Sequence, residues 1–257
     1  MSGEKRHQVK ARYQPIHKVT VHDLRAMYAV FRRYYDNISL EQFIEDMSGK
    51  TGIFVLRDDN EKRIVGFSTL TSKQLRMGRR SVTGVFSGDT ILESEYWGNR
   101  SLQVAFYVRM VLERFKRPFS PVFWLLISKG YKTYLLLANN FSRYYPDVEG
   151  RFDWLEPYVD GYCRTLFPHA YCPDRKLLDF GEGSTHLKGE VTPITREMRE
   201  RHPKIRFFEE CNPSWQRGTE LPCIGLVGYR DVVRFPLLLL AKSWRRLRAG
   251  SAEVRYE

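Results

Sequence analysis

The residues best suited to chemistry lie between positions 90 and 101, after an apolar, β-branched run and before a long apolar segment. The run at 82–92 predicts a strand, Gly98 marks a turn, and the residues from Leu102 onward predict a helix. A helix that opens directly after a glycine turn presents unpaired backbone N–H groups and the positive end of its dipole. This spacing predicts an anion site, and an ordinary strand-to-helix connection is the alternative.

Composition indicates a folded, basic protein. The 257 residues are 42% hydrophobic and 14% aromatic, which is enough to bury a sizeable core. The net charge of +12 implies an acidic partner. Nucleic acid, an anionic membrane, a phosphate-bearing cofactor and an acidic carrier protein all fit that charge.

Cysteine usage and the apolar runs indicate the compartment. The four cysteines form no Cys-x-x-Cys pair, which argues against a zinc site and favours a reduced, cytoplasmic chain. The N-terminus lacks the apolar core of a signal peptide, and the longest apolar runs are too short to span a bilayer. We therefore expect a soluble protein, with contact to a membrane surface left open.

Two capping boxes predict the first two helices. Thr20 with Asp23 opens one amphipathic helix, and Ser39 with Gln42 opens a shorter one. Residues 1–18 are basic and polar without a period, and we expect them to be frayed.

Three strands follow at 52–57, 63–71 and 82–92, and their short links predict an antiparallel meander. After the helix that ends near Lys116, the apolar residues of 130–139 predict a further buried strand, followed by another helix. The sequence thus predicts an α+β fold.

This order of elements resembles the GCN5-related N-acetyltransferase (GNAT) superfamily. Residues 91–102, Ile-Leu-Glu-Ser-Glu-Tyr-Trp-Gly-Asn-Arg-Ser-Leu, look like the family's acyl-donor strand and pyrophosphate loop. Residues 130–145 are similar to its next strand, the terminal Asn and the following Tyr. Glu95 stands where Arg or Gln is usual, and Arg100 stands where Gly or Ala is usual.

The resemblance implies a GNAT-like mixed, mainly antiparallel twisted sheet flanked by helices. It divides the chain into a flexible N-terminus (1–18), an acyltransferase core (19–160) and a C-terminal extension (161–257). We expect the extension to complete the fold and the acceptor side.

The resemblance also implies a donor site. Backbone N–H groups of the loop would hold phosphate oxygens, the strand edge at 90–93 would bond the pantetheine amides, and Arg100 would add a phosphate contact. The donor would be an acyl-CoA or an acyl carrier protein thioester, with no metal. The candidate donor-binding residues are Leu92, Trp97, Gly98, Asn99, Arg100, Ser101 and Asn139.

Three residues are candidates for proton transfer in such a site. Glu93, at the end of the donor strand, would face the cleft as the base, and a solvated charge is the alternative. Tyr144 or Tyr145 matches the family's Tyr that protonates the departing sulfur, with aromatic packing as the alternative.

The implied activity is N-acyl transfer from a thioester to an amine of a peptide or a small molecule. Apolar residues after the donor helix would suit a tunnel for a fatty acyl chain, or they could be core. These residues are Phe119, Val122, Phe123, Trp124, Leu125 and Leu126.

The last segment, 232–248, reads as a basic amphipathic helix. Its basic residues are Lys242, Arg245, Arg246 and Arg248, together with Arg234. Such a helix suits an anionic membrane surface or an acidic partner, and a helix docked on the fold is the alternative.

Two rival functions explain part of the same sequence. A nucleic-acid-binding module would account for the charge, but the chain lacks a helix-turn-helix, RRM or zinc-finger signature. A catalytically silent GNAT fold would account for the departures in the loop. Salt-dependent retention on DNA would favour the first, and thioester binding without turnover would favour the second.

Overall fold

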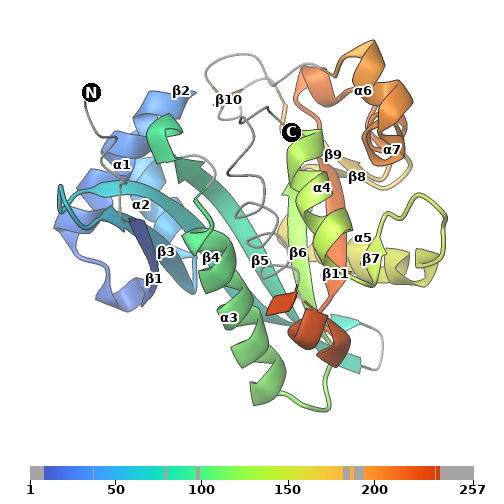
Figure 1. The fold of residues 1–257 in the computed structure, drawn as a ribbon, viewed down its shortest axis with the longest axis horizontal. Helices are drawn as coiled ribbons and strands as arrows, with labels where there is room; N and C mark the ends of the chain where they lie inside the picture. Colours follow the sequence, from blue (N-terminus) through green and yellow to red (C-terminus); the bar gives the residue numbers. More distant parts are fainter. Residues whose placement is uncertain are drawn as a thin grey trace, which may run out of the picture.

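A mixed seven-stranded sheet organises the protein, which we describe from a computed structural model (Figure 1). The structure describes residues 9–36, 38–77, 80–96, 99–181, 186–187, 194–234 and 236–237. In spatial order the strands are β1 (Val9–Pro15), β3 (Gly52–Asp58), β4 (Ile64–Met77), β5 (Arg80–Leu92), β6 (Val122–Ser128), β11 (Leu221–Leu226) and β7 (Tyr144–Tyr145). Neighbours in the sheet run antiparallel, except that β5 and β6 are parallel. The expected α+β class with a mixed, mainly antiparallel sheet is confirmed.

Helices cover both faces of this sheet. Successive side chains of a strand point to opposite faces of the sheet, so adjacent residues of β3 contact different helices. Phe54 packs with α3 and α4 on one face, whereas Ile53 and Val55 pack with α1 and α2 on the other. The helices are α1 (Val21–Tyr34), α2 (Leu40–Ser48), α3 (Ser101–Lys116), α4 (Tyr131–Asn140), α5 (Glu156–Leu166), α6 (Arg196–Arg201) and α7 (Pro203–Cys211). Two small ribbons add β2 (Tyr35–Asp36) with β10 (His186–Leu187), and β8 (Tyr171–Cys172) with β9 (Leu177–Leu178).

Both capping boxes are present. The Thr20 hydroxyl accepts the Asp23 N–H at 3.1 Å, and the Ser39 hydroxyl accepts the Gln42 N–H at 3.2 Å. The expectation of a frayed N-terminus is wrong for residues 9–15, which form β1 and pair with β3 at seven positions. Residues 1–8 lie outside the described part.

The strand expected at 130–139 is also wrong, because these residues form helix α4. Tyr131, Tyr134, Leu137 and Ala138 are its buried residues, a helical spacing that the continuous apolar run hides. The following residues, Tyr144 and Tyr145, form strand β7 instead of a helix.

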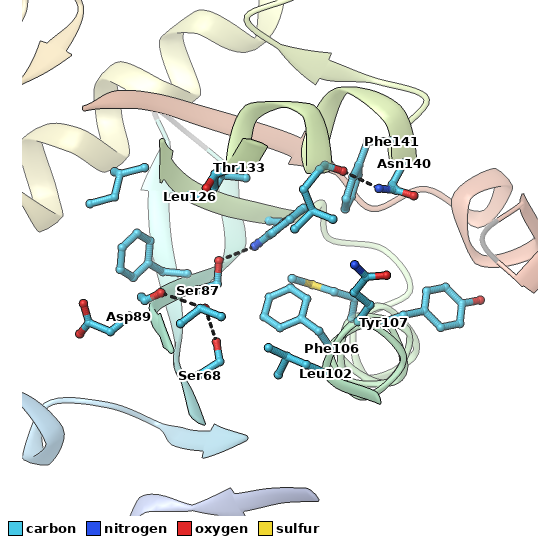
Figure 2. Close-up of a pocket in the computed structure, with 18 of the residues that line it drawn as sticks. Ser68, Ser87, Asp89, Leu102, Phe106, Tyr107, Leu126, Thr133, Asn140 and Phe141 are labelled. Atoms are coloured by element: carbon cyan, nitrogen blue, oxygen red, sulfur yellow. Dashed lines mark hydrogen bonds between the residues drawn. The ribbon is translucent and has the colours of Figure 1, made fainter. Parts of the chain in front are cut away.

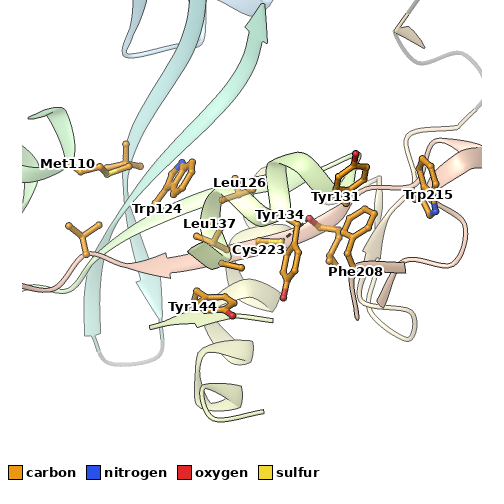
Figure 3. Close-up of a cluster of buried hydrophobic side chains, with 14 of the residues drawn as sticks. Met110, Trp124, Leu126, Tyr131, Tyr134, Leu137, Tyr144, Phe208, Trp215 and Cys223 are labelled. Atoms are coloured by element: carbon orange, nitrogen blue, oxygen red, sulfur yellow. Dashed lines mark hydrogen bonds between the residues drawn. The ribbon is translucent and has the colours of Figure 1, made fainter. Parts of the chain in front are cut away.

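The residues after position 160 complete the central sheet. Strand β11 lies between β6 and β7 and pairs with both. The Tyr162 hydroxyl lies 3.1 Å from the Leu126 carbonyl and 3.2 Å from the Cys223 carbonyl, which ties α5 to β6 and β11. Figure 3 shows the shared core of α4, α7, β6 and β11, with Tyr134 between Cys223 and Phe208.

The C-terminal segment is described only in part. Its backbone is helical at 229–234 and 236–237, and the basic residues from Lys242 onward lie outside the described residues. Within the described residues, every helix is too short or too polar to cross a bilayer.

Strands β5 and β6 separate soon after they meet. They pair only from Thr83 with Val122 to Phe86 with Leu125, although β5 continues to Leu92 and β6 to Ser128. The separation coincides with a β-bulge, where Thr69 of β4 faces both Gly88 and Asp89 of β5. Since a bulge bends its strand and increases its twist, it turns β5 away from β6 and opens the sheet.

We predict that Gly88→Ala lowers the free energy of unfolding by about 1–3 kcal/mol. A Cβ at this position would stand 2.3 Å from the Thr69 hydroxyl oxygen, so the bulge would have to shift. That hydroxyl is buried and has no hydrogen-bond partner among the described residues, which makes Thr69→Ala a mild change. Urea unfolding should show that Gly88→Ala lowers the free energy of unfolding by less in the Thr69→Ala background than in the wild-type background. An equal cost in both backgrounds would contradict the close contact.

Candidate functional site

A cavity of about 600 Å³ occupies the space where β5 and β6 separate (Figure 2). Its walls come from both faces of the sheet. Trp124 and Leu126 belong to the core that packs with α3 and α4, whereas Phe86 and Phe167 belong to the core around α5. The cavity therefore passes through the sheet, so that two ligands could meet from opposite faces.

The half of the cavity beside α3 and α4 is mainly apolar. In Figure 2, Leu102, Phe106 and Tyr107 of α3 lie on one side of it, and Thr133 and Phe141 lie on the other. At the point of separation, the Trp124 indole donates to the Ser87 hydroxyl at 2.8 Å. This hydrogen bond fixes the indole ring as part of the apolar wall.

The edge of β5 that faces the cavity is not covered by β6. Beyond Phe86, β5 pairs with β4 on its other side, and β6 makes no further pairs with it. Ser87, Gly88, Asp89 and Thr90 all line the cavity. An unpaired strand edge offers backbone donors and acceptors to an extended ligand that carries amides.

The N-terminus of α3 lies at the same half of the cavity. Its first helical hydrogen bond runs from the Val104 N–H to the Arg100 carbonyl, and the Ser101 N–H donates to the Asn99 side chain at 2.8 Å. The amides of Leu102 and Gln103, which line the cavity, therefore lack acceptors within the helix. The buried Ser101 hydroxyl also lacks a partner among the described residues. These donors and the helix dipole favour an anion such as a phosphate.

The other half of the cavity holds ionisable groups, namely Asp89, Lys50, Lys129, Glu220 and Tyr35. Burial raises the pKa of Glu220 to about 7; Lys129, whose Nζ lies 4.0 Å away, opposes this shift, and Asp89 adds to it. Burial likewise raises the pKa of Asp89 and that of Tyr35. A carboxyl group that titrates near neutral pH inside a cavity is suited to accept a proton.

Glu220 is held by its own backbone. The Glu220 N–H donates to the Leu178 carbonyl and the Leu178 N–H donates to the Glu220 carbonyl, each at 2.9 Å. Gly218, with φ of +95°, makes the turn that leads into this bridge. Side-chain exposure of Glu220 is 15%, so its carboxyl is shielded but reachable from the cavity. The sequence analysis does not identify Glu220 or Asp89. Two signals could have found them: Glu220 is an acid directly before the apolar strand β11, and Asp89 follows a glycine in the middle of strand β5.

Glu93, the predicted base, does not line the cavity. Its carboxyl is buried, and its two oxygens accept from Arg33 and Arg63. These ion pairs connect the residue after β5 to α1 and to the turn that precedes β4, which is a structural role.

Tyr144 and Tyr145 also lie away from the cavity, on the far side of β11. The Tyr145 hydroxyl donates to Glu156 at 2.9 Å. Burial and a hydrogen bond to Asp147 raise the pKa of Tyr144. Asn139 is exposed on α4 and accepts from Lys204 at 2.8 Å, while its neighbour Asn140 lines the cavity.

Of the predicted donor-loop residues, Trp97 and Gly98 lie outside the described residues. Leu92 ends β5 and packs against the buried cluster of Val9, Leu56, Val65 and Tyr96, whereas Ser101 begins α3, with Arg100 at its N-cap and Asn99 just before it. Of the predicted tunnel residues, Trp124 and Leu126 line the cavity. Val122, Phe123 and Leu125 are buried core, and Phe119 is exposed.

The described part of the chain contains no candidate metal site. Among the described residues, no group of three or more His, Cys, Asp or Glu side chains is placed to hold a metal ion.

Comparisons with known proteins give only distant likenesses. No protein-family profile and no curated protein matches the chain. A probable N-acyltransferase from Enterococcus faecalis aligns at a TM-score of 0.38 and 14% identity, over 51% of this chain and 32% of its own length. Arabidopsis thaliana NAA60, solved with a bisubstrate analogue, aligns at a TM-score of 0.38 and 14% identity, over 52% of this chain and 87% of its own length. The GNAT family N-acetyltransferase YhbS from Escherichia coli, solved with CoA, aligns at a TM-score of 0.34 and 14% identity, over 49% of this chain and 67% of its own length.

We predict that Glu220 makes the stability of the protein depend on pH. Its pKa is raised from 4.5 to about 7, so the folded protein binds this proton more tightly than the unfolded chain does. Its contribution to the free energy of unfolding is therefore greatest below about pH 4.5, falls by about 3 kcal/mol as the pH rises to about 7, and is constant above.

Urea unfolding of wild type and Glu220→Gln across this range isolates the effect, because the other titrating groups are common to both proteins. The difference in unfolding free energy between them should change with pH in that window. A difference that stays constant with pH would show that Glu220 is not buried as described.

Proposed function

We propose that the protein is an N-acyltransferase that moves an acyl group from an acyl-CoA or acyl carrier protein thioester to an amine. The observation that supports this best is the cavity through the sheet, with anion-binding amides at one half and a carboxyl of raised pKa at the other. A donor that carries phosphates and a pantetheine arm and an acceptor that carries an ammonium group would meet in the gap between β5 and β6.

The donor half offers each part of such a thioester a partner. The amides of Leu102 and Gln103 would bind phosphate oxygens, and the free edge of β5 at 87–90 would bond the pantetheine amides. The apolar wall of Phe106, Met110 and Trp124 would hold the acyl chain. Because this wall continues to Phe141 and Val227, we propose an acyl chain longer than acetyl.

The acceptor half would prepare the nucleophile. Glu220 takes a proton from the ammonium group, and the free amine attacks the thioester carbonyl carbon. The carbon–nitrogen bond forms, the carbon–sulfur bond breaks, and the thiolate leaves with the electron pair. The attacking nitrogen loses two protons in all: Glu220 takes the first and later releases it to solvent, and the second ends on sulfur, so that the products are an amide and a thiol. Tyr35 lines the same half and stays protonated, which makes it the phenol best placed to donate to the sulfur.

We predict that Glu220→Gln lowers kcat about 10²–10⁴-fold and leaves donor affinity unchanged, because a base acts on the acceptor and not on the donor. Wild-type kcat/KM should rise with pH through about 7, since only the carboxylate form of Glu220 accepts a proton. Mass spectrometry of a panel of amines, with acetyl-CoA and a medium-chain acyl-CoA as donors, measures product, and titration calorimetry measures donor affinity.

Tyr145→Phe and Glu93→Gln are the comparison variants, because both side chains lie outside the cavity. If Glu93→Gln abolishes turnover while Glu220→Gln retains it, the base is Glu93, as the sequence predicts. If Tyr145→Phe does so, the proton donor is Tyr145. If wild type binds acyl-CoA but acylates no amine in the panel, the silent binding protein becomes the better account.

A further inference from the structure

The outward side of α3 is apolar. Val104, Val108, Leu112 and Phe115 follow one another at spacings of four, four and three residues, and they are between 41% and 59% exposed. The outward face of a surface helix normally carries polar residues. In Figure 1, α3 lies in front of the sheet.

Two charged residues of α3, Arg109 and Glu113, are placed on its inward side instead. Arg109 and Glu113 form an ion pair at 2.7 Å with side chains 14% and 5% exposed. The Arg109 guanidinium also lies over the ring of Tyr13, 4.3 Å from its centre. The helix therefore exposes four large apolar residues on its outer side while it buries an ion pair on its inner side, a pattern that indicates an apolar partner for the outer side.

The apolar area extends beyond the helix. It includes the tip of the loop after α3, where Phe119 is 99% exposed, and the segment after β11. The Tyr107 hydroxyl donates to the Val232 carbonyl, and the rings of Phe115 and Tyr229 lie 6.3 Å apart, so that the segment is fixed beside α3. Eight of the thirteen large apolar residues exposed in the described chain gather here. We call them the α3 surface: Val104, Val108, Leu112, Phe115, Phe119, Tyr229, Val233 and Leu237.

The exposed charges beside the α3 surface are positive. Lys116, Arg230 and Arg234 are exposed, whereas the two acids of these segments, Glu113 and Asp231, are buried. Asp231 accepts the N–H groups of Ser142 at 2.9 Å and of Gly228 at 3.0 Å, which removes its charge from the surface. An apolar area with a positive border complements an anionic lipid surface.

We propose that the α3 surface docks on an anionic membrane. The outer side of a helix and the protruding ring of Phe119 are convex, and a fluid bilayer adapts to such a shape more readily than a folded partner does. The sequence after Leu237 continues with four further apolar residues and then with a basic stretch, in keeping with an interfacial segment. Tyr107, Val111 and Val232 of the same segments line the cavity. The proposal is independent of acyl transfer, since docking needs no donor.

Co-sedimentation of the full chain tests the proposal, with vesicles of equal parts phosphatidylglycerol and phosphatidylcholine or of phosphatidylcholine alone. Wild type should pellet with the anionic vesicles at low salt and be released at high salt. Val108→Glu with Leu112→Glu should weaken binding at least about tenfold, because each buries a charge at the lipid boundary. Replacing Lys116, Arg230 and Arg234 by Gln should lower binding roughly fivefold per residue and flatten the salt dependence.

The matched control is Val21→Glu with Ile44→Glu, which makes the same charge change at exposed apolar residues of α1 and α2. It should pellet like wild type. Phe119→Asp is a second test variant, because a fully exposed loop side chain contributes no packing to the fold. Circular dichroism and the melting temperature of each variant check that it is folded.

Three outcomes would overturn the proposal. Wild type could fail to pellet with anionic vesicles, or the test and control variants could pellet equally. Alternatively, the α3 variants could abolish binding to an acidic acyl carrier protein or dissociate a dimer seen by sedimentation equilibrium, without a change in vesicle binding. The surface would then belong to a protein partner.

Discussion

The β-bulge at Gly88 and Asp89 is the constraint on which the site depends. Two residues of β5 oppose Thr69 of β4, and from that point β5 no longer pairs with β6. A continuous sheet would bury this region as core and leave no passage between its faces. The separation instead exposes one strand edge, brings Asp89 into the cavity and leaves room for two ligands to meet.

Both ends of the chain are needed to complete the site. The N-terminal part supplies Tyr35, Lys50 and the bulged strand, and α3 supplies Leu102 and Gln103 at its N-terminal end. Glu220 comes from the C-terminal part, where β11 enters the sheet between β6 and β7. The paired backbone hydrogen bonds with Leu178 hold Glu220 in place, so the ionisable half of the cavity depends on the residues after position 160.

Local signals predicted the elements whose determinants are local. The capping boxes at Thr20 and Ser39 and the helix that begins at Ser101 follow from adjacent residues, and the structure contains them. Strand β1 was missed because Lys10 and Arg12 alternate with Val9 and Ala11, a charged pattern that suits an edge strand.

Features that depend on distant contacts were not predicted. The continuous apolar run at 130–139 predicts a strand, and the helical period of α4 appears only in the pattern of its buried residues. Glu93 was chosen as the base because it ends the donor strand, but two arginines from other elements bind it. Burial raises the pKa of Glu220 and Asp89 adds to the shift against the opposing charge of Lys129, and both residues are far from Glu220 in sequence.

The central claim is that the gap between β5 and β6 seats the thioester, and a crystal structure with a non-hydrolysable acyl-CoA analogue tests it most directly. We predict phosphate oxygens at the amides of Leu102 and Gln103 and the pantetheine arm along the edge of β5. The atom that replaces the thioester sulfur should lie in the gap, with the acyl carbonyl facing the half that holds Glu220. An analogue bound elsewhere, for instance in the cavity beside β7 lined by Tyr145 and Glu156, would contradict the account.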